Sequence, residues 1–181
     1  MTEHHDVAIS KKNRKKAISL IPVKLIQQEE KLLVRIQASK KKPLAKLNYL
    51  FDFMSEISKP FQHLTPCKTG CSHCCNIRVD VSELEVFNIK KYAKNASKNR
   101  TTGLAIGDPC PFLKNNTCSI YEFRPFVCRR HQVFTPSSDL CSPEQDTGQE
   151  LLAFSEVDKS FNYILSEYGS VALTDIRTHF S

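Results

Sequence analysis

Hydrophobic residues recur at helical spacing in three stretches of the chain. Apolar positions three or four residues apart lie on one face of a helix, so each stretch predicts an amphipathic helix packed against a core. The positions are Leu25, Ile26, Leu32, Leu33 and Ile36 in the first stretch, Leu44, Leu47, Leu50, Phe51, Met54, Ile57 and Phe61 in the second, and Leu151, Leu152, Phe154, Val157, Phe161, Ile164 and Leu165 in the third.

Proline and glycine mark the ends of these stretches. The first stretch predicts a helix or two short helices. Pro22 lies near its start, where a proline is tolerated because a residue in the first helical turn donates no intrahelical hydrogen bond. Pro60 closes the second stretch, and Gly169 is placed to stop the third.

The middle of the chain has a different pattern. A β-like run at residues 77–81 leads into Ser82 and Glu85, which have the spacing of a capping box, so a helix is predicted from about residue 83 to 94. Further on, Asn115 and Asn116 separate two short arms, as in a β-hairpin whose turn would bring Cys110 and Cys118 together.

These elements predict an α+β fold, with a small, helix-rich domain whose irregular cysteine-rich loop and short β-hairpin surround a metal site. We expect a basic disordered tail at residues 1–16 and N-terminal helices at 17–64. A cysteine-cluster metal-binding domain with a C-terminal helix follows at 65–168, and a tail at 169–181.

The net charge of +7 is unevenly placed, because residues 1–48 carry +8 and the remainder −1. The basic run at residues 11–16 is a place where nucleic acid or another acidic partner could bind, although aromatic residues are not interleaved with it. No run approaches the roughly 20 apolar residues of a membrane span. With its polar start, the sequence predicts a cytoplasmic protein that has no membrane partner.

Eight cysteines concentrate between residues 67 and 141. Thiolates at spacings of two and three residues can converge on one centre, and soft sulfur favours zinc, copper(I) or iron–sulfur clusters. The candidate metal ligands are Cys67, Cys71, Cys74, Cys75, Cys110, Cys118, Cys128 and Cys141.

The number of metal sites stays open at this stage. Neighbouring Cys74 and Cys75 face opposite ways in an extended segment, so one of them serves a second site or only packs. With His73 and His131 as spare nitrogen donors, the thiols suit two four-ligand sites or one larger cluster. Eight cysteines with few histidines favour an iron–sulfur cluster slightly over Zn²⁺.

Other interpretations explain less of the pattern. Disulfides are disfavoured because no secretion signal is visible, and ordinary packing suits Cys141 better than the tight cluster. The spacing of Cys67, Cys71 and Cys74 also occurs in radical S-adenosylmethionine enzymes, but the repeated strand-helix units of those enzymes are missing from the predicted elements. Hydrolytic zinc catalysis needs an open ligand position, which all-thiolate sites usually lack.

The order of these motifs resembles the YkgJ-type cysteine-cluster family, which is described as zinc- or iron-chelating. The resemblance covers residues 67–141 and rests on C-x3-C-x2-CC, D-P-C-P-F-L, C-S-I-Y-E-x-R-P-x2-C-R and the final Cys141. It implies a bacterial metal-binding protein, and the same kind of cluster occurs in flagellin lysine N-methylases. Redox or methyl-transfer chemistry is therefore one expectation, and a structural zinc module that binds nucleic acid or an unknown protein partner is the other.

Overall fold

The computed structural model describes residues 2–68, 70–96, 108–141 and 152–180. Helices dominate the fold, and the two small antiparallel sheets have two strands each, so the predicted α+β class is confirmed. Within the described residues, every helix is too short or too polar to cross a membrane.

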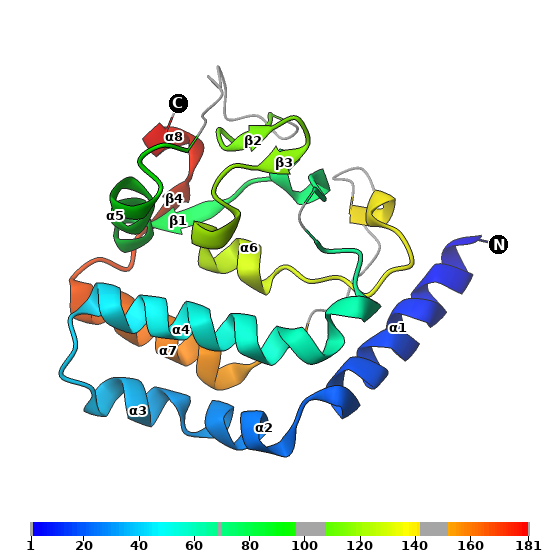
Figure 1. The fold of residues 1–181 in the computed structure, drawn as a ribbon, viewed down its shortest axis with the longest axis horizontal. Coiled ribbons are helices and arrows are strands. Elements are labelled where there is room, and N and C mark those ends of the chain that lie inside the picture. The colour runs from blue at the N-terminus through cyan, green and yellow to red at the C-terminus, as the bar shows by residue number, and fades with distance from the viewer. Residues whose placement is uncertain (1, 69, 97–107, 142–151, 181) are drawn as a thin grey trace.

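The helices α1 to α4 and α7 build one half of the molecule (Figure 1). In this half α4 and α3 both pack against α7, and the buried residues of the helices form a continuous core. The elements are α1 (Thr2–Leu20), α2 (Val23–Glu30), α3 (Leu32–Ala38), α4 (Pro43–Ser58), the 3-10 helix η1 (Lys59–Leu64) and α7 (Ser155–Tyr168).

Most of the predicted helix signals in this half are confirmed. The first stretch forms two short helices, and Pro22 is the N-cap of α2. Gly169 ends α7 in the left-handed conformation at φ 95°, which glycine adopts without steric cost. Of the apolar positions predicted for α7, Leu151 lies outside the described residues, and Leu152 and Phe154 precede the helix.

The expected disordered tail at residues 1–16 is corrected by the structure, because α1 is a helix from Thr2 to Leu20. Its inner face packs against η1, with Ala17 fully buried. The side chain of Asn13 donates to the carbonyl of Phe134 at 3.2 Å. These contacts with distant parts of the chain hold a segment whose composition alone predicted disorder.

A second hydrophobic core lies under the cysteine-rich half of the molecule. Its helices and strands are short. They are η2 (His73–Asn76), β1 (Asp80–Ser82), α5 (Glu83–Tyr92), β2 (Leu113–Lys114), β3 (Thr117–Cys118), η3 (Tyr121–Phe123), α6 (Phe126–Arg130), η4 (Ser138–Cys141), β4 (Leu173–Asp175) and α8 (Arg177–Phe180).

The capping box and the hairpin are both confirmed. Ser82 accepts from the N–H of Glu85, and the Glu85 carboxylate accepts from the N–H of Ser82, so α5 begins where predicted and ends at Tyr92. In the hairpin, β2 and β3 pair with Leu113 opposite Cys118. Asn115 and Asn116 have φ of 48° and 57°, the left-handed values of a tight hairpin turn.

The segment expected to be a C-terminal tail is instead part of the fold. Strand β4 pairs antiparallel with β1, with Asp80 opposite Asp175, and α8 follows it. Phe180 is buried against Phe112, with ring centroids 4.9 Å apart. The end of the described chain therefore closes the core beneath the cysteines.

Candidate metal centre

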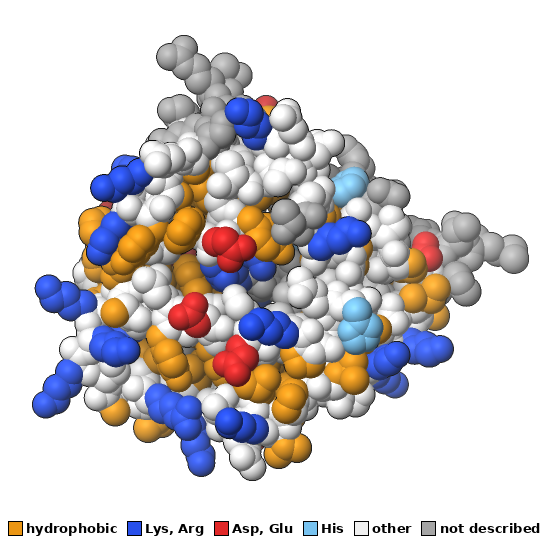
Figure 2. Space-filling view, viewed as in Figure 1, with side chains coloured by type: hydrophobic (Ala, Val, Ile, Leu, Met, Phe, Trp, Pro, Cys, Tyr) orange, Lys and Arg blue, Asp and Glu red, His pale blue; other side chains and the backbone are white. Residues whose placement is uncertain are grey.

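Seven of the eight cysteines line a single cavity of about 330 Å³. The cavity lies between α4 and η1 on one side and the cysteine-bearing loops, the hairpin and α6 on the other. Figure 2 shows this face of the molecule hollowed near its middle, with Lys or Arg atoms set back in the hollow. The lining cysteines are Cys67, Cys71, Cys74, Cys75, Cys110, Cys118 and Cys128.

Backbone turns aim the first cysteines into the cavity. The N–H of Cys71 donates to the carbonyl of Lys68, and the N–H of Cys75 donates to the carbonyl of Ser72. Gly70, at φ 92°, takes the left-handed conformation directly before Cys71, inside the first of these turns. These successive turns replace the extended chain in which neighbouring side chains would face opposite ways.

Two further cysteines belong to the hairpin region, with Cys110 before strand β2 and Cys118 in strand β3. The predicted turn brings both to the cavity wall, although Cys110 precedes β2 and is not the cross-strand partner of Cys118. The N–H of Cys110 donates to the carbonyl of Cys75 at 2.7 Å, which ties the hairpin to η2. Of the two aromatic side chains near the hairpin, Tyr121 lines the cavity, whereas Phe112 lies in the core beneath it.

Cys128 comes from α6, within one turn of Pro125. Pro125 is the N-cap, and Phe126 is the first residue of the helix. The N–H of Phe126 donates to the buried carboxylate of Glu85 at 2.7 Å. Because this contact joins α6 to α5, it fixes where Cys128 enters the cavity.

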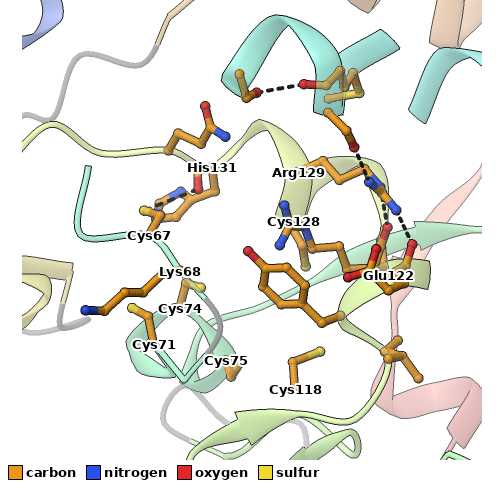
Figure 3. A pocket seen from close by; sticks show the side chains of 18 of the residues that line it. Cys67, Lys68, Cys71, Cys74, Cys75, Cys118, Glu122, Cys128, Arg129 and His131 are labelled. Carbon is orange, nitrogen blue, oxygen red and sulfur yellow. Dashed lines mark hydrogen bonds between the residues drawn. The ribbon is translucent and has the colours of Figure 1, made fainter. Parts of the chain in front are cut away.

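Cys141 is the exception among the candidate ligands. It lies in η4, which contacts η2, but its side chain does not line the cavity. His131, considered in the sequence only as a spare donor, does line the cavity. The thiol of Cys67 lies 3.9 Å from the carbonyl of His131, and Figure 3 shows the two residues side by side.

The adjacent thiols of Cys74 and Cys75 interact directly. A hydrogen bond from the Cys75 thiol lowers the pKa of Cys74 to about 7, and the same bond, with burial, raises the pKa of Cys75. Burial raises the pKa of Cys110 to about 11 and also raises the pKa of Cys128. A bound cation would reverse these upward shifts, since it favours the thiolate form.

Arginine side chains form one wall of the cavity. Arg124 lies over the ring of Tyr121 at 3.9 Å, and its charge contributes to lowering the pKa of Cys74. Arg129 donates to the carbonyl of Arg124 at 3.0 Å and to the Oγ of Ser55 at 3.1 Å. Burial lowers the pKa of Arg129 to about 10. Sequence reasoning missed Arg129 and Lys68, which also line the cavity, because a basic residue beside a cysteine is not distinctive by itself.

The donor set fits a thiophilic metal by its chemistry. All eight cysteines lie within the described residues and none of them is in a disulfide. Seven thiols and one imidazole on one cavity are the ligands that zinc and iron–sulfur centres use. In the described part of the chain, however, no three Cys, His, Asp or Glu side chains converge closely enough to hold one ion. Metal binding therefore requires the donors to draw together.

Residues 66–151 match the CxxCxxCC family. The family is described as a "putative zinc- or iron-chelating domain", and the match covers a little under half of the chain. It confirms the resemblance to a zinc- or iron-chelating cysteine-cluster family. No curated protein and no solved structure matches the chain.

The CxxCxxCC match does not contain the whole cavity wall. Met54 in α4 and Ile176 after β4 both line the cavity but lie outside residues 66–151. The N-terminal helices and the C-terminal segment after β4 therefore complete a site whose cysteines all belong to the CxxCxxCC segment.

Proposed function

We propose that this protein holds an iron–sulfur centre on the cysteines of the cavity and uses it in redox or methyl-transfer chemistry. The observation that carries the proposal is the gathering of seven thiols from three separate parts of the chain around one cavity. Such a centre supplies electrons or polarises a bound group when it is present. The chain supplies the thiolates, the surrounding arginines and the apolar cover.

The size of the donor set favours a cluster over one ion. A structural zinc ion is satisfied by four ligands at about 2.3 Å for sulfur. Here seven thiols share a cavity of about 330 Å³, and no three described donors meet at one point. A polynuclear centre accommodates thiolates that are spread around a larger volume.

The surroundings suit an anionic thiolate centre. Burial raises the pKa of Cys118, and the positive charge of Arg124 offsets part of that rise. Met54, Ile120 and Tyr121 contribute apolar surface to the cavity. Exclusion of water and nearby positive charge are two of the means by which a protein adjusts the potential of such a centre.

The decisive experiment is anaerobic purification of the full chain, followed by an absorption spectrum and analysis of iron, zinc and sulfide on one sample. We expect a brown protein with matched iron and sulfide. A colourless protein with stoichiometric zinc would overturn the iron–sulfur proposal in favour of a zinc site, and a protein without either metal would overturn metal binding altogether.

The ligands are tested by three matched serine variants. Cys71→Ser and Cys110→Ser should lower bound metal, because both residues line the cavity. Cys141→Ser is the control, since Cys141 is not among the residues that line the cavity, and it should keep the metal. Unchanged metal in both cavity variants would contradict the ligand assignment.

A structural zinc module that binds nucleic acid is the second candidate. Its support is helix α1, which displays four exposed lysines, Lys11, Lys12, Lys15 and Lys16. Binding through phosphates would weaken steeply with salt and would be lost when these lysines are replaced by glutamate. Salt-independent binding to a DNA duplex, or none at low salt, would exclude this role for α1.

A further inference from the structure

We infer that the cavity holds two metal centres, one on Cys75, Cys110, Cys118 and Cys128, and the other on Cys67, Cys71, Cys74 and His131. The inference rests on the proposed function, because it divides the donors of the same cavity. It replaces Cys141 by His131 as the eighth donor.

The first set is defined by what lies beneath it. Cys110 is buried within the second hydrophobic core, and Cys75, Cys118 and Cys128 pack against that same core as half-buried side chains. Cys67, Cys71 and Cys74 do not belong to that cluster or to the residues packed on it. The core thus separates four thiols from the other three.

Backbone contacts hold the first set together. The hydrogen bond from the N–H of Cys110 to the carbonyl of Cys75 joins two of its members at 2.7 Å. Cys75 also lies within electrostatic reach of Cys110 and Cys118. Cys128 lies within electrostatic reach of Cys110 and Cys118 from the facing helix α6, and also of Cys74, which therefore lies between the two sets.

The second set lies on the opposite side of the cysteine loop. In Figure 3, Cys67 and Cys71 lie on the side of His131 and Lys68, whereas Cys75 and Cys118 lie together on the other side. Cys67 is within electrostatic reach of Cys71 and Cys74. The contact of its thiol with the carbonyl of His131 places that histidine beside the set.

The adjacent cysteines Cys74 and Cys75 form the boundary between the sets. Both residues lie in the 3-10 helix η2, where successive side chains point about 120° apart, so Cys74 and Cys75 can serve different centres although their thiols are hydrogen-bonded to each other. One residue for each centre explains why two cysteines stand side by side. The two metal centres would then be linked directly through the chain.

The two donor sets also differ in chemistry. Four thiolates form a closed, electron-rich site, which suits zinc or a cluster. Three thiolates with one imidazole form a less negative site, and a histidine in place of cysteine raises the reduction potential of an iron–sulfur centre. The two centres would therefore differ in negative charge and in reduction potential.

The test compares the metal content of full-length variants purified anaerobically. Cys118→Ser and Cys110→Ser remove donors of the first set, and Cys67→Ser and His131→Ala remove donors of the second. Each single variant should lose about half of the metal, and the double variant Cys118→Ser/Cys67→Ser should lose nearly all of it.

Cys141→Ser and His73→Ala are controls that should keep the full metal content. Circular dichroism verifies that each variant folds. If Cys110→Ser misfolds because Cys110 is buried, Cys118→Ser still tests the first set, because Cys118 is only half-buried.

A second readout addresses His131 directly. Pulsed electron paramagnetic resonance of the reduced or cobalt-substituted protein should detect a ¹⁴N ligand that disappears in His131→Ala and persists in His73→Ala. Complete loss of metal in every cavity variant would show one shared centre and overturn the division, while leaving the proposed function intact. A wild-type protein that holds no metal would overturn the proposed function as well.

Discussion

The carboxylate of Glu85 accepts the backbone N–H of Phe126 at 2.7 Å, across 41 residues of sequence. Its other oxygen accepts from the N–H and the hydroxyl of Ser82 at 2.8 and 2.7 Å. One buried side chain therefore completes the capping box of α5 and also holds the first N–H of α6. Since Cys128 lies two residues after Phe126, the same carboxylate positions a thiol of the cavity.

Replacing Glu85 by glutamine should destabilise the fold. The amide oxygen can still accept from one side, but the NH₂ group then faces a backbone donor, and an unsatisfied buried donor costs about 1–3 kcal/mol. Urea unfolding measures this loss. Glu83→Gln is the matched control, because Glu83 is exposed in the same helical turn. Equal stability of the two variants would contradict the structural role of Glu85.

The titration of Glu85 gives the fold a pH dependence. Burial raises the pKa of Glu85 above its ordinary value of 4.5. The folded protein then binds this proton more tightly than the unfolded chain, so the free energy of unfolding falls as pH rises from about 4.5 through the raised pKa. Urea unfolding across this window should show the slope in the wild type. The slope should vanish in Glu85→Gln, and its persistence there would assign it to another group.

Arg177 should be the most important polar residue of the C-terminal segment. It is only 2% exposed, and it donates to both oxygens of Asp175 at 3.0 and 2.9 Å. It also donates to the carbonyls of Ile77 and Asp108, which lie two residues from Cys75 and Cys110. Arg177→Met leaves a buried carboxylate unpaired, which costs about 3–5 kcal/mol.

Two companion variants test this explanation of Arg177. Arg78→Met removes an ion pair with Asp80 that is exposed to solvent, and it should change the unfolding midpoint little. The double variant Asp175→Asn/Arg177→Met should be more stable than Arg177→Met, because the unpaired charge is gone. A double variant that is less stable would show that the carbonyl contacts, not the ion pair, carry the effect.

Local signals in the sequence predicted much of this fold. The capping box at Ser82, the Asn115 turn and the Gly169 stop depend on residues a few positions apart, and all three appear in the structure. Helix α1 and strand β4 were missed because their stability comes from distant partners. Asn13 contacts Phe134 and Asp80 pairs with Asp175, and no local pattern reports such contacts.

The candidate site was predictable in composition but not in arrangement. Cysteine spacing identified the seven thiols that line the cavity, although their role as ligands stays a prediction. The sequence set Cys141 apart as the cysteine that ordinary packing suits best, but it could not favour His131, because His131 and Cys141 lie ten residues apart on irregular chain. Only the placement of α6 and η4 decides which of them faces the cavity.

The hairpin turn should tolerate glycine and reject a β-branched residue. Asn116 has φ 57°, a conformation that costs most L-residues roughly 1–2 kcal/mol and glycine little. Asn116→Val should lower the melting temperature, whereas Asn116→Gly should leave it unchanged or raise it. Equal melting temperatures would mean that the turn does not keep this conformation.

The ion pair between Lys46 and Glu167 should respond unequally to loss of its two partners. The ammonium of Lys46 lies 2.8 Å from both oxygens of Glu167, and it also faces the ring of Tyr163. The Lys46 side chain is 2% exposed, whereas that of Glu167 is 34% exposed. The pair therefore joins α4 to α7 with its cation buried and its anion at the surface.

Glu167→Ala should destabilise the protein more than Lys46→Met. The first change leaves a buried ammonium without its partner, which costs about 3–5 kcal/mol. The second leaves a carboxylate that water can solvate, and it fills the buried position with an apolar chain of similar length. Adding Lys46→Met to Glu167→Ala should recover stability in urea unfolding, because the buried charge is removed. If Lys46→Met costs more than Glu167→Ala, the aliphatic packing and the ring contact of Lys46 outweigh the burial of its charge.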